Sequence, residues 1–267
     1  MKHVKFDMHV HTAEGSPDSS GGIREYIEIL KNKGFGGMMV TDHNSYKGHD
    51  SLKEYDIDPN SDFIILKGIE YDTLSSGHML IVMPEGPIPK GLYHRGLTLK
   101  SVIRLVHENG GIIGPAHMCG EPFLSFYSTG FWFKNPAKKR NLIEQFDFIE
   151  GYNACENDDN NLHARMIAEI YDKPMTGGSD AHRNDAVGLG YTLLPENVRT
   201  QQDFIDLIRS GQKLRIGGHF YGKSTKEKLG RANHLLVYGF FYYNKALNLA
   251  KQTQRFLKRT KNSDLEG

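Results

Sequence analysis

The chain has 267 residues, of which 38% are hydrophobic and 24% charged, a globular composition that fits one large barrel-type domain or two smaller ones. Its formal net charge of +1 excludes a strong global field that would drive binding to nucleic acid or an acidic membrane. Cys119 and Cys155 form neither a disulfide framework nor a Cys-x-x-Cys metal motif, and no apolar run reaches the roughly 20 residues needed to cross a bilayer. We therefore expect a cytoplasmic protein with reduced cysteines, no targeting segment and no membrane partner.

The first predicted strand runs from Phe6 to His11. Because alternate side chains of a strand share a face, His9 and His11 project the same way, as two ligands of a divalent metal would. Asp7 lies on that face too, where its carboxylate is placed to hold a ligating imidazole through the second ring nitrogen. A His-x-His pair alone is more often part of an ordinary surface strand, so later elements must supply its partners.

Strands and helices alternate through most of the chain. Predicted strands follow at 37–40, 63–70, 79–83, 111–114 and 146–150, and predicted helices at 23–33, 98–109, 160–171 and 200–211. This alternation indicates parallel strands joined by crossovers, in an open sheet or a barrel. Residues 216–222 form either one more short strand or a turn.

Two segments depart from this rhythm. Residues 121–136 are rich in aromatic side chains without a clear period, which favours a hydrophobic cluster beneath a long loop over a lid above a site. A long helical pattern from Leu229 to Thr260 becomes basic toward its end. We interpret it as a helix with a solvent-exposed outer face, followed by a tail. The alternative is a docking surface for an acidic partner.

Imidazole and carboxylate side chains recur where the predicted strands end. They are His9, His11, His43, Glu70, His117, Asp180 and His182. In a barrel of parallel strands these ends meet on one rim, where active sites are built. Buried charges are costly there unless they are paired or bind metal. His78 fits this pattern less well, because it precedes its strand instead of ending it.

In order and combination, the motifs of this chain resemble those of the PHP family, the polymerase and histidinol phosphatase domain. The resemblance spans Val4 to Gly190 and rests on Asp7-Met8-His9-Val10-His11, Thr41-Asp42-His43, Glu70, His78, His117 and Ser179-Asp180-Ala181-His182. It implies an α/β fold, a distorted (β/α)7 TIM-like barrel carrying two or three divalent ions (Mn, Fe or Zn). We expect this barrel over residues 1–222 and a C-terminal helical extension with a basic tail over residues 223–267.

The resemblance also implies a ligand set. It places His9, His11, Glu70 and Asp180 around a first metal, with Glu70 bridging to a second metal that His78 and His117 complete. A third metal would sit between His43, His182 and a residue of the loop after the first strand. The family often has Ser-Asp-Gly or a histidine there, whereas this chain has Ser16 and Pro17. Of the two available carboxylates we favour Glu14, whose side chain is longer; the alternative, Asp18, would also suit a helix cap.

The expected activity is hydrolysis of a small phosphate ester or nucleotide by a hydroxide held between metals at Glu70. Asp7 and Asp42 would support the ligands, and the planar guanidinium of Arg183 would contact phosphate. No stable complex with nucleic acid is expected. Two alternatives remain open: an amidohydrolase-like, metal-dependent C–N hydrolase, which also opens with His-x-His, and a metal-binding regulatory PHP domain without turnover.

Overall fold

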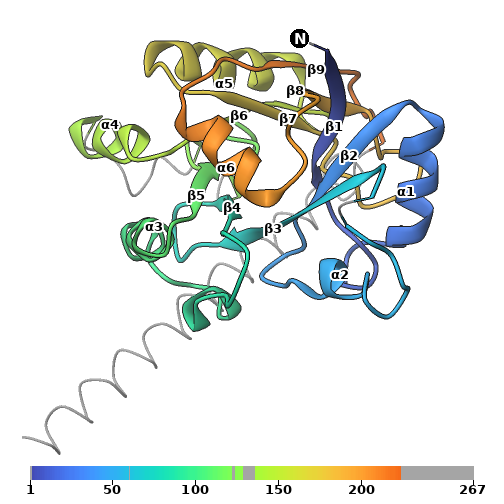
Figure 1. Cartoon of the computed structure of the whole chain (residues 1–267). Helices are drawn as coiled ribbons and strands as arrows, with labels where there is room; N and C mark the ends of the chain where they lie inside the picture. The colour runs from blue at the N-terminus through green and yellow to red at the C-terminus, as the bar shows by residue number, and fades with distance from the viewer. Residues whose placement is uncertain (1, 60, 122–123, 129–135, 224–267) are drawn as a thin grey trace, which may run out of the picture.

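The computed structural model describes residues 2–59, 61–121, 124–128 and 136–223 (Figure 1). The predicted C-terminal helical extension lies outside the described residues, as do residues 122, 123 and 129–135 of the aromatic segment. Within the ranges given above, no helix has the length and apolar character that crossing a membrane requires.

Strands and helices alternate along the first part of the described chain, and this alternation is interrupted at two places. In chain order the elements are β1 (His3–Val10), α1 (Ile23–Asn32), β2 (Phe35–Val40), α2 (Lys47–Asp50), β3 (Ile64–Asp72), β4 (His78–Val82), the 3-10 helix η1 (Lys90–Tyr93), α3 (Leu99–Glu108), β5 (Ile112–Pro115), α4 (Pro136–Glu144), β6 (Ile149–Asn153), α5 (Asp158–Ile170), β7 (Met175–Gly178), β8 (Gly190–Pro195), α6 (Gln201–Arg209) and β9 (Arg215–Gly218). No helix stands between β3 and β4 or between β7 and β8, and β8 was not predicted.

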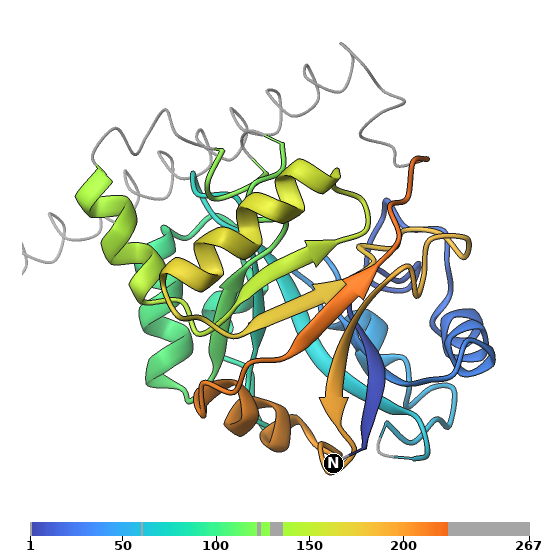
Figure 2. The ribbon, with the colours of Figure 1, turned by 90° about the horizontal axis from the view of Figure 1, so that it is seen from above.

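The strands form a curled sheet in the order β5-β4-β3-β2-β1-β8-β9, beside a parallel pair of β6 and β7. A parallel bridge between Val10 and Ala181 joins the end of β1 to the residues that follow β7. Figure 2 shows the strands curling around one another, with α1 on one side and α3 and α4 on the other. The fold is therefore a mixed α/β fold with a curled half-barrel sheet, consistent with the TIM-like fold we expected.

The expectation of parallel strands is wrong for β4, and β8, which was not predicted, is antiparallel as well. β1, β2 and β3 pair in parallel, but β4 is antiparallel to both β3 and β5, and β8 is antiparallel to β1. Only the short turn 73–77 joins β3 to β4, and a parallel pair needs a crossover of a dozen or more residues. Gly77, in the left-handed region at φ +73°, closes this turn.

Helices form where apolar spacing and caps predicted them. In α1 the residues Ile23, Tyr26, Ile27 and Leu30 are buried at helical spacing. The Thr98 side chain accepts from the Ser101 amide at the start of α3. At the start of α6, Thr200 and Asp203 form the reciprocal capping box that the sequence indicates.

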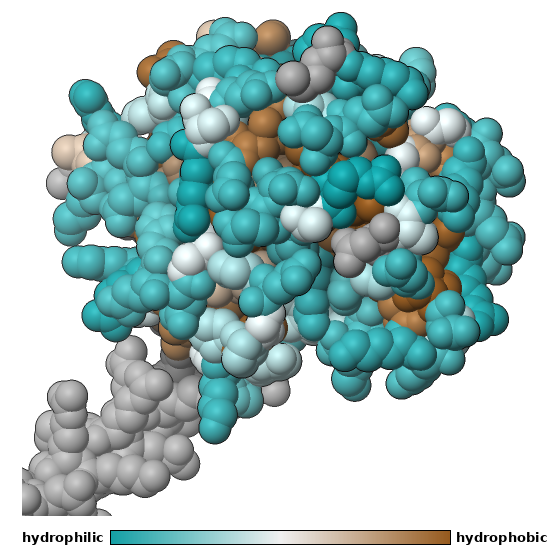
Figure 3. Space-filling model, in the orientation of Figure 1, coloured by the Kyte–Doolittle hydropathy of each residue, from teal (hydrophilic) through white to brown (hydrophobic). Residues whose placement is uncertain are grey.

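Apolar side chains cover both faces of the sheet. On one face the buried residues of α1 pack in a cluster with Met38, Val40 and Ile65. On the other, Phe204, Ile205 and Ile208 of α6 share a cluster with apolar residues of several strands, among them Phe6, Met39 and Leu66. Figure 3 shows a mostly hydrophilic outer surface in this view, with apolar atoms visible between polar side chains. The core thus holds the strands from both sides and fixes where their ends lie.

The reversed direction of β4 resolves the odd position of His78. Because β4 runs antiparallel to β3, its first residue lies at the same edge of the sheet as the last residue of β3, and His78 pairs directly with Asp72. The beginning of β4 and the carboxyl ends of β1, β2 and β3 therefore meet on one rim.

Candidate metal centre

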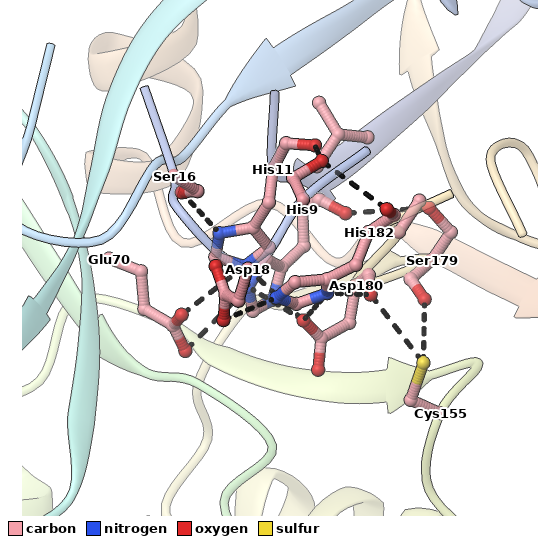
Figure 4. Close-up of polar contacts among 12 residues, drawn as sticks. His9, His11, Ser16, Asp18, Glu70, Cys155, Ser179, Asp180 and His182 are labelled. Atoms are coloured by element: carbon pink, nitrogen blue, oxygen red, sulfur yellow. Dashed lines mark hydrogen bonds and ion pairs between the residues drawn. The ribbon is translucent and has the colours of Figure 1, made fainter. Parts of the chain in front are cut away.

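All but one of the predicted ligands converge on this rim, and most are almost completely buried. His9, His11, Glu70 and Asp180 are at most 3% exposed, and His78 and His117 are 8% and 5% exposed. They come from β1, β3, β4 and the segments after β5 and β7. Figure 4 shows the imidazoles of His9, His11 and His182 packed together beside the carboxylates of Asp18, Glu70 and Asp180.

The first predicted position is bounded by His9, His11, Glu70 and Asp180. The Nε2 atoms of His9 and His11 are 3.0 Å apart. Oδ1 of Asp180 lies 3.5 Å from Nε2 of His9 and 3.3 Å from Nε2 of His11. Oε2 of Glu70 lies 3.3 Å from the same His11 atom. These nitrogen and oxygen atoms face one point, as the ligands of a single cation do.

Glu70 also faces the second predicted position with its other oxygen. Oε1 lies 3.0 Å from Nδ1 of His78 and 3.0 Å from Nε2 of His117. One carboxylate therefore contacts the ligand sets of two positions, which is the geometry that a bridging ligand requires.

At the third predicted position the structure brings Asp18, the alternative carboxylate, next to His43 and His182, and it does not bring Glu14 there. Oδ2 of Asp18 lies 3.5 Å from Nε2 of His43 and 3.3 Å from Nε2 of His182. Both carboxylate oxygens of Glu14 instead accept from the backbone N–H of Ile23, at the start of α1. Glu14 thus takes the role of a helix cap that the sequence had suggested for Asp18.

In four histidines a polar group contacts Nδ1, and this contact fixes the orientation of the imidazole. Nδ1 of His9 lies 2.8 Å from Glu150, Nδ1 of His11 3.3 Å from Ser16, Nδ1 of His117 3.1 Å from Ser125, and Nδ1 of His182 3.0 Å from the carbonyl of Asp180. The carboxylate of Glu150 and the carbonyl of Asp180 can only accept a hydrogen bond, and Ser16 donates its own hydroxyl to Asp42, so Nδ1 of His9, His182 and His11 is the donor and the proton on each ring lies there.

The donor atoms of this site fit a metal ion. With Nδ1 protonated, the Nε2 lone pairs of His9 and His11 face each other at 3.0 Å, next to two carboxylates. Acceptor atoms repel one another at this separation unless a proton or a cation lies between them. Two further buried atoms, Nδ1 of His43 and Oδ1 of Asp72, have no hydrogen-bond partner. The clusters therefore suggest divalent metals, which mixed imidazole and carboxylate donors suit.

Asp7 does not hold an imidazole, and this part of the prediction is wrong. Its buried carboxylate accepts from the backbone N–H groups of Ser179 and Gly188, both at 2.8 Å. Burial raises the pKa of Asp7 to about 6, although these hydrogen bonds oppose the shift. Asp7 instead fixes the segment that carries Asp180.

The residue that holds His9 is Glu150 on β6, which the sequence analysis missed. Its other oxygen accepts from the backbone N–H of His117 and from Asn153, whose amide also donates to Asp180 at 3.2 Å. Glu150 belongs to none of the motifs named above, but it ends the predicted strand 146–150, and this position at a strand end is the signal that could have pointed to it.

Asp42 lies behind the imidazole of His11, whereas Arg183 lies at the surface beside an acidic neighbour. Asp42 accepts from the hydroxyl of Ser16 at 3.0 Å, and Ser16 in turn contacts His11, so Asp42 supports that imidazole through one intermediate. The side chain of Arg183 is 59% exposed, and its Nε lies 3.6 Å from Asp185. Arg183 therefore stands beside His182 with an acidic partner of its own.

Electrostatics favour an ionised carboxylate at the centre. Burial alone would raise the pKa of Glu70, but His78, His43 and His9 hold it well below its usual range. Burial, together with neighbouring His182 and His43, lowers the pKa of His11 and so favours the neutral ring that a metal needs.

Two predicted ligands have a backbone conformation that most residues avoid. His117 has φ +30° and Asp180 has φ +53°, both in the left-handed region. Such a conformation costs about 1 kcal/mol or more at a residue other than glycine and is concentrated at functional sites. The surrounding contacts, including the Asp180 amide that donates to the His9 carbonyl at 2.8 Å, hold this geometry in place.

Comparisons with known proteins agree with this fold. A family model described as PHP-associated matches residues 158–212. The structure of PsfC from Pseudomonas syringae is similar with a TM-score of 0.60 and 20% identity, over 92% of this chain and 100% of that one. Endonuclease Q in complex with a 27-mer duplex has a TM-score of 0.59 and 18% identity, over 80% of this chain and 58% of its own.

A third similar structure is a two-domain protein from Bacteroides vulgatus that contains a predicted PHP-like metal-dependent phosphoesterase. Its TM-score is 0.54 at 15% identity, over 82% of this chain and 65% of that chain. This chain thus spans less than two thirds of the second and third structures. The fold and the site define an α/β protein with a cluster of metal-ligand side chains on the rim of a curled sheet. A PHP-associated family model thus matches one segment of this chain, and the similar structures, at 20% identity or less, show the same type of fold.

Proposed function

We propose that this protein is a metal-dependent phosphoesterase that hydrolyses a small phosphate ester or nucleotide at a di- or trinuclear site. The single observation that carries the proposal is the place of Glu70, whose two oxygens lie 3.0–3.3 Å from imidazoles of separate ligand groups. A shared carboxylate of this kind holds cations close enough to act on one substrate group. Similar structures that include phosphoesterase and endonuclease proteins support the broader class, a metal-dependent hydrolase.

The proposed ligands are His9, His11, Glu70 and Asp180 for the first ion, Glu70, His78 and His117 for the second, and His43, His182 and Asp18 for the third. Bound divalent ions would supply a water of lowered pKa as nucleophile and offset charge on the phosphate. Glu150, Ser16 and Ser125 orient the imidazoles through their Nδ1 atoms. Manganese, iron and zinc all suit this mixture of donors.

Two arginines at the site are proposed to bind the anionic substrate. Arg183 follows His182 directly and is mostly exposed. Nη1 of Arg95, which the sequence analysis did not single out, lies 3.8 Å from the buried carboxylate of Asp72 beside His78. Each planar guanidinium offers paired N–H donors that match phosphate oxygens.

A second candidate function is cleavage of damaged nucleic acid. One similar structure is Endonuclease Q bound to a duplex with an abasic lesion at its active site. This likeness partly conflicts with our expectation that no nucleic-acid complex forms. The net charge of +1 gives no general affinity for DNA, so we place the small phosphate ester first.

The deciding experiment offers the purified chain, with added Mn²⁺, three parallel substrate panels: phosphate mono- and diesters, abasic-site duplexes, and amides. Turnover of phosphate esters that His9→Ala and Asp180→Ala both abolish would support the proposal. Cleavage restricted to the duplex would favour the nuclease, and turnover restricted to amides would favour the amidohydrolase-like alternative. A folded, metal-loaded chain that is inert on all three panels would indicate a regulatory domain without turnover.

A further inference from the structure

A buried carboxylate that the sequence analysis did not select lies between two of the proposed metal positions. Asp72 is 4% exposed, ends β3, and pairs across the sheet with His78, the first residue of β4. Residues paired in this way place their side chains on the same face of the sheet. The pairing therefore brings the Asp72 carboxylate next to the His78 imidazole as a direct result of the β3–β4 turn.

One oxygen of Asp72 faces two imidazoles at once. Oδ1 lies 3.3 Å from Nε2 of His78 and 3.5 Å from Nδ1 of His43. Both Oδ1 of Asp72 and Nδ1 of His43 are buried without a well-aligned hydrogen bond, and Nδ1 of His43 also lies 3.1 Å from Oε2 of Glu70. A buried acceptor and a buried ring nitrogen left in this state are costly, unless a small closure of the site brings them together.

The second oxygen of Asp72 is already committed elsewhere. Oδ2 accepts from the side-chain amide of Asn44 at 2.7 Å, and Nη1 of Arg95 lies 3.8 Å away. The side-chain oxygen of Asn44 accepts in return from the Asp72 backbone N–H at 3.0 Å. This reciprocal pair of bonds fixes the carboxylate plane and directs Oδ1 toward the imidazoles.

Asn44 also ties the two neighbouring strand ends together. It follows His43, has φ +50°, and its backbone N–H donates to the carbonyl of Glu70 at 3.0 Å. His43 and Asp72 are thus held at a fixed separation by one residue that bonds to both the backbone and the side chain at the end of β3. The contact between Asp72 and the imidazoles does not depend on a mobile loop.

His78 differs from the other imidazoles in the ring nitrogen that contacts a supporting residue. In His9, His11 and His117 the supporting residue contacts Nδ1, whereas in His78 Nδ1 faces Glu70 and Nε2 faces Asp72. Both ring nitrogens of His78 thus face carboxylates, and a cation bound at Nδ1 beside Glu70 would leave the ring proton on Nε2, directed at Asp72. His78 is therefore set up as an Nδ1 ligand, in contrast to the Nε2 ligands around it.

We infer that Asp72 is the positioning residue for His78 and His43 together, and that it couples the second and third metal positions. A metal bound at one position orders its imidazole, which draws Oδ1 of Asp72 into place for the other. Occupancy of the second and third positions is then cooperative through Asp72, while coupling between the first and second positions runs through the shared carboxylate of Glu70. This inference rests on the ligand assignment of the proposed function, but it concerns metal binding and not turnover.

The first test compares the wild-type chain with Asp72→Asn by titration of the metal-free protein with Zn²⁺. Asparagine has a single acceptor oxygen, so it cannot serve both Asn44 and the imidazoles. The loss of a partner of this kind weakens metal affinity by about 10- to 100-fold. We expect this loss of affinity for two of the three Zn²⁺ equivalents together, and unchanged affinity for the third. Asp50→Asn, which removes an exposed ion pair with Lys67, is the matched control and should leave all equivalents unchanged.

Unchanged binding in Asp72→Asn, or a loss confined to one equivalent, would overturn the inference. If Asp72→Asn fails to fold, a second measurement does not need the variant. It is nitrogen-15 NMR of the histidine rings in the wild-type, Zn²⁺-loaded chain. His78 is expected as the Nε2–H tautomer while His9, His11 and His117 are Nδ1–H. His78 in the Nδ1–H form would rule out the role of Asp72. Coupled zinc binding in a chain without phosphoesterase activity would retain this inference and reject the proposed function.

Discussion

Nδ1 of His9 lies 2.8 Å from Oε1 of Glu150, and both side chains are almost completely buried. This pair sets the tautomer of the first proposed ligand from a strand that carries no part of the recognised motifs. It also links the ligand groups of two proposed metals, since the other oxygen of Glu150 accepts from the backbone of His117.

Glu150→Gln should weaken the first metal position. Glutamine has one acceptor oxygen and no charge, so it cannot hold both His9 and the backbone of His117. Removal of such a carboxylate lowers metal affinity by about 10- to 100-fold. Titration of the metal-free variant with Mn²⁺ measures this loss, and Glu144→Gln, at an exposed pair with Arg140, is its control. Equal affinities in the two variants would contradict the role of Glu150.

Asp18→Ala and Glu14→Ala should separate the two carboxylates of the first loop. Without Asp18 the third position loses its carboxylate, so elemental analysis should find less metal bound per chain. Without Glu14 the first N–H of α1 loses its acceptor, which lowers the free energy of unfolding by about 1 kcal/mol and leaves the metal content unchanged. The reverse pattern would restore Glu14 as the ligand.

Asp7 should make the stability of the metal-free protein depend on pH. Its pKa is about 6 in the folded chain against an ordinary value of 3.8, because burial disfavours the ionised form. The unfolded chain therefore loses this proton first, and the contribution of Asp7 to stability falls as the pH rises from 4 through 6. Over that range the wild-type protein should lose about 3 kcal/mol relative to Asp7→Asn, which does not titrate. Urea unfolding of both proteins at several pH values measures the difference, and a difference that stays constant with pH would refute the shift.

Gln201 should matter for stability although it lies outside the site. Its buried amide donates to the carbonyls of Lys67 and Met83, and its oxygen accepts from the Lys67 N–H, so it ties α6 to β3 and to the end of β4. Gln201→Ala leaves these backbone groups without partners, at an expected cost of about 3 kcal/mol in urea unfolding. The adjacent exposed Gln202→Ala should change stability by less than about 0.5 kcal/mol.

Much of the site could be predicted from the sequence, because its residues are polar at positions where a core needs apolar side chains. His9, His11, His43, Glu70 and Asp180 stand out for this reason. The direction of β4 could not be read from its own residues, since a buried run of apolar residues looks the same in either direction. Only the short turn before His78 carried that information.

The supporting residues were harder to predict for a different physical reason. Glu150 and Asp72 act through contacts between strands that are distant in sequence or reversed in direction, and no spacing rule reveals such contacts. The choice between Glu14 and Asp18 could not be predicted from spacing either. Side-chain length suggested Glu14, but the path of the loop decided which carboxylate reached the imidazoles.

The register between β3 and β4 gives the site a sensitivity that point substitutions would not reveal. Asp72 lies opposite His78, and Glu70 lies opposite Leu80, so the length of the turn 73–77 determines which side chains of β4 face inward. A single residue inserted or deleted there would turn His78 away and present Met79 in its place. Relatives that differ in the length of this hairpin by one residue would therefore need a new ligand on that strand, whereas a difference of two residues would preserve the alternation.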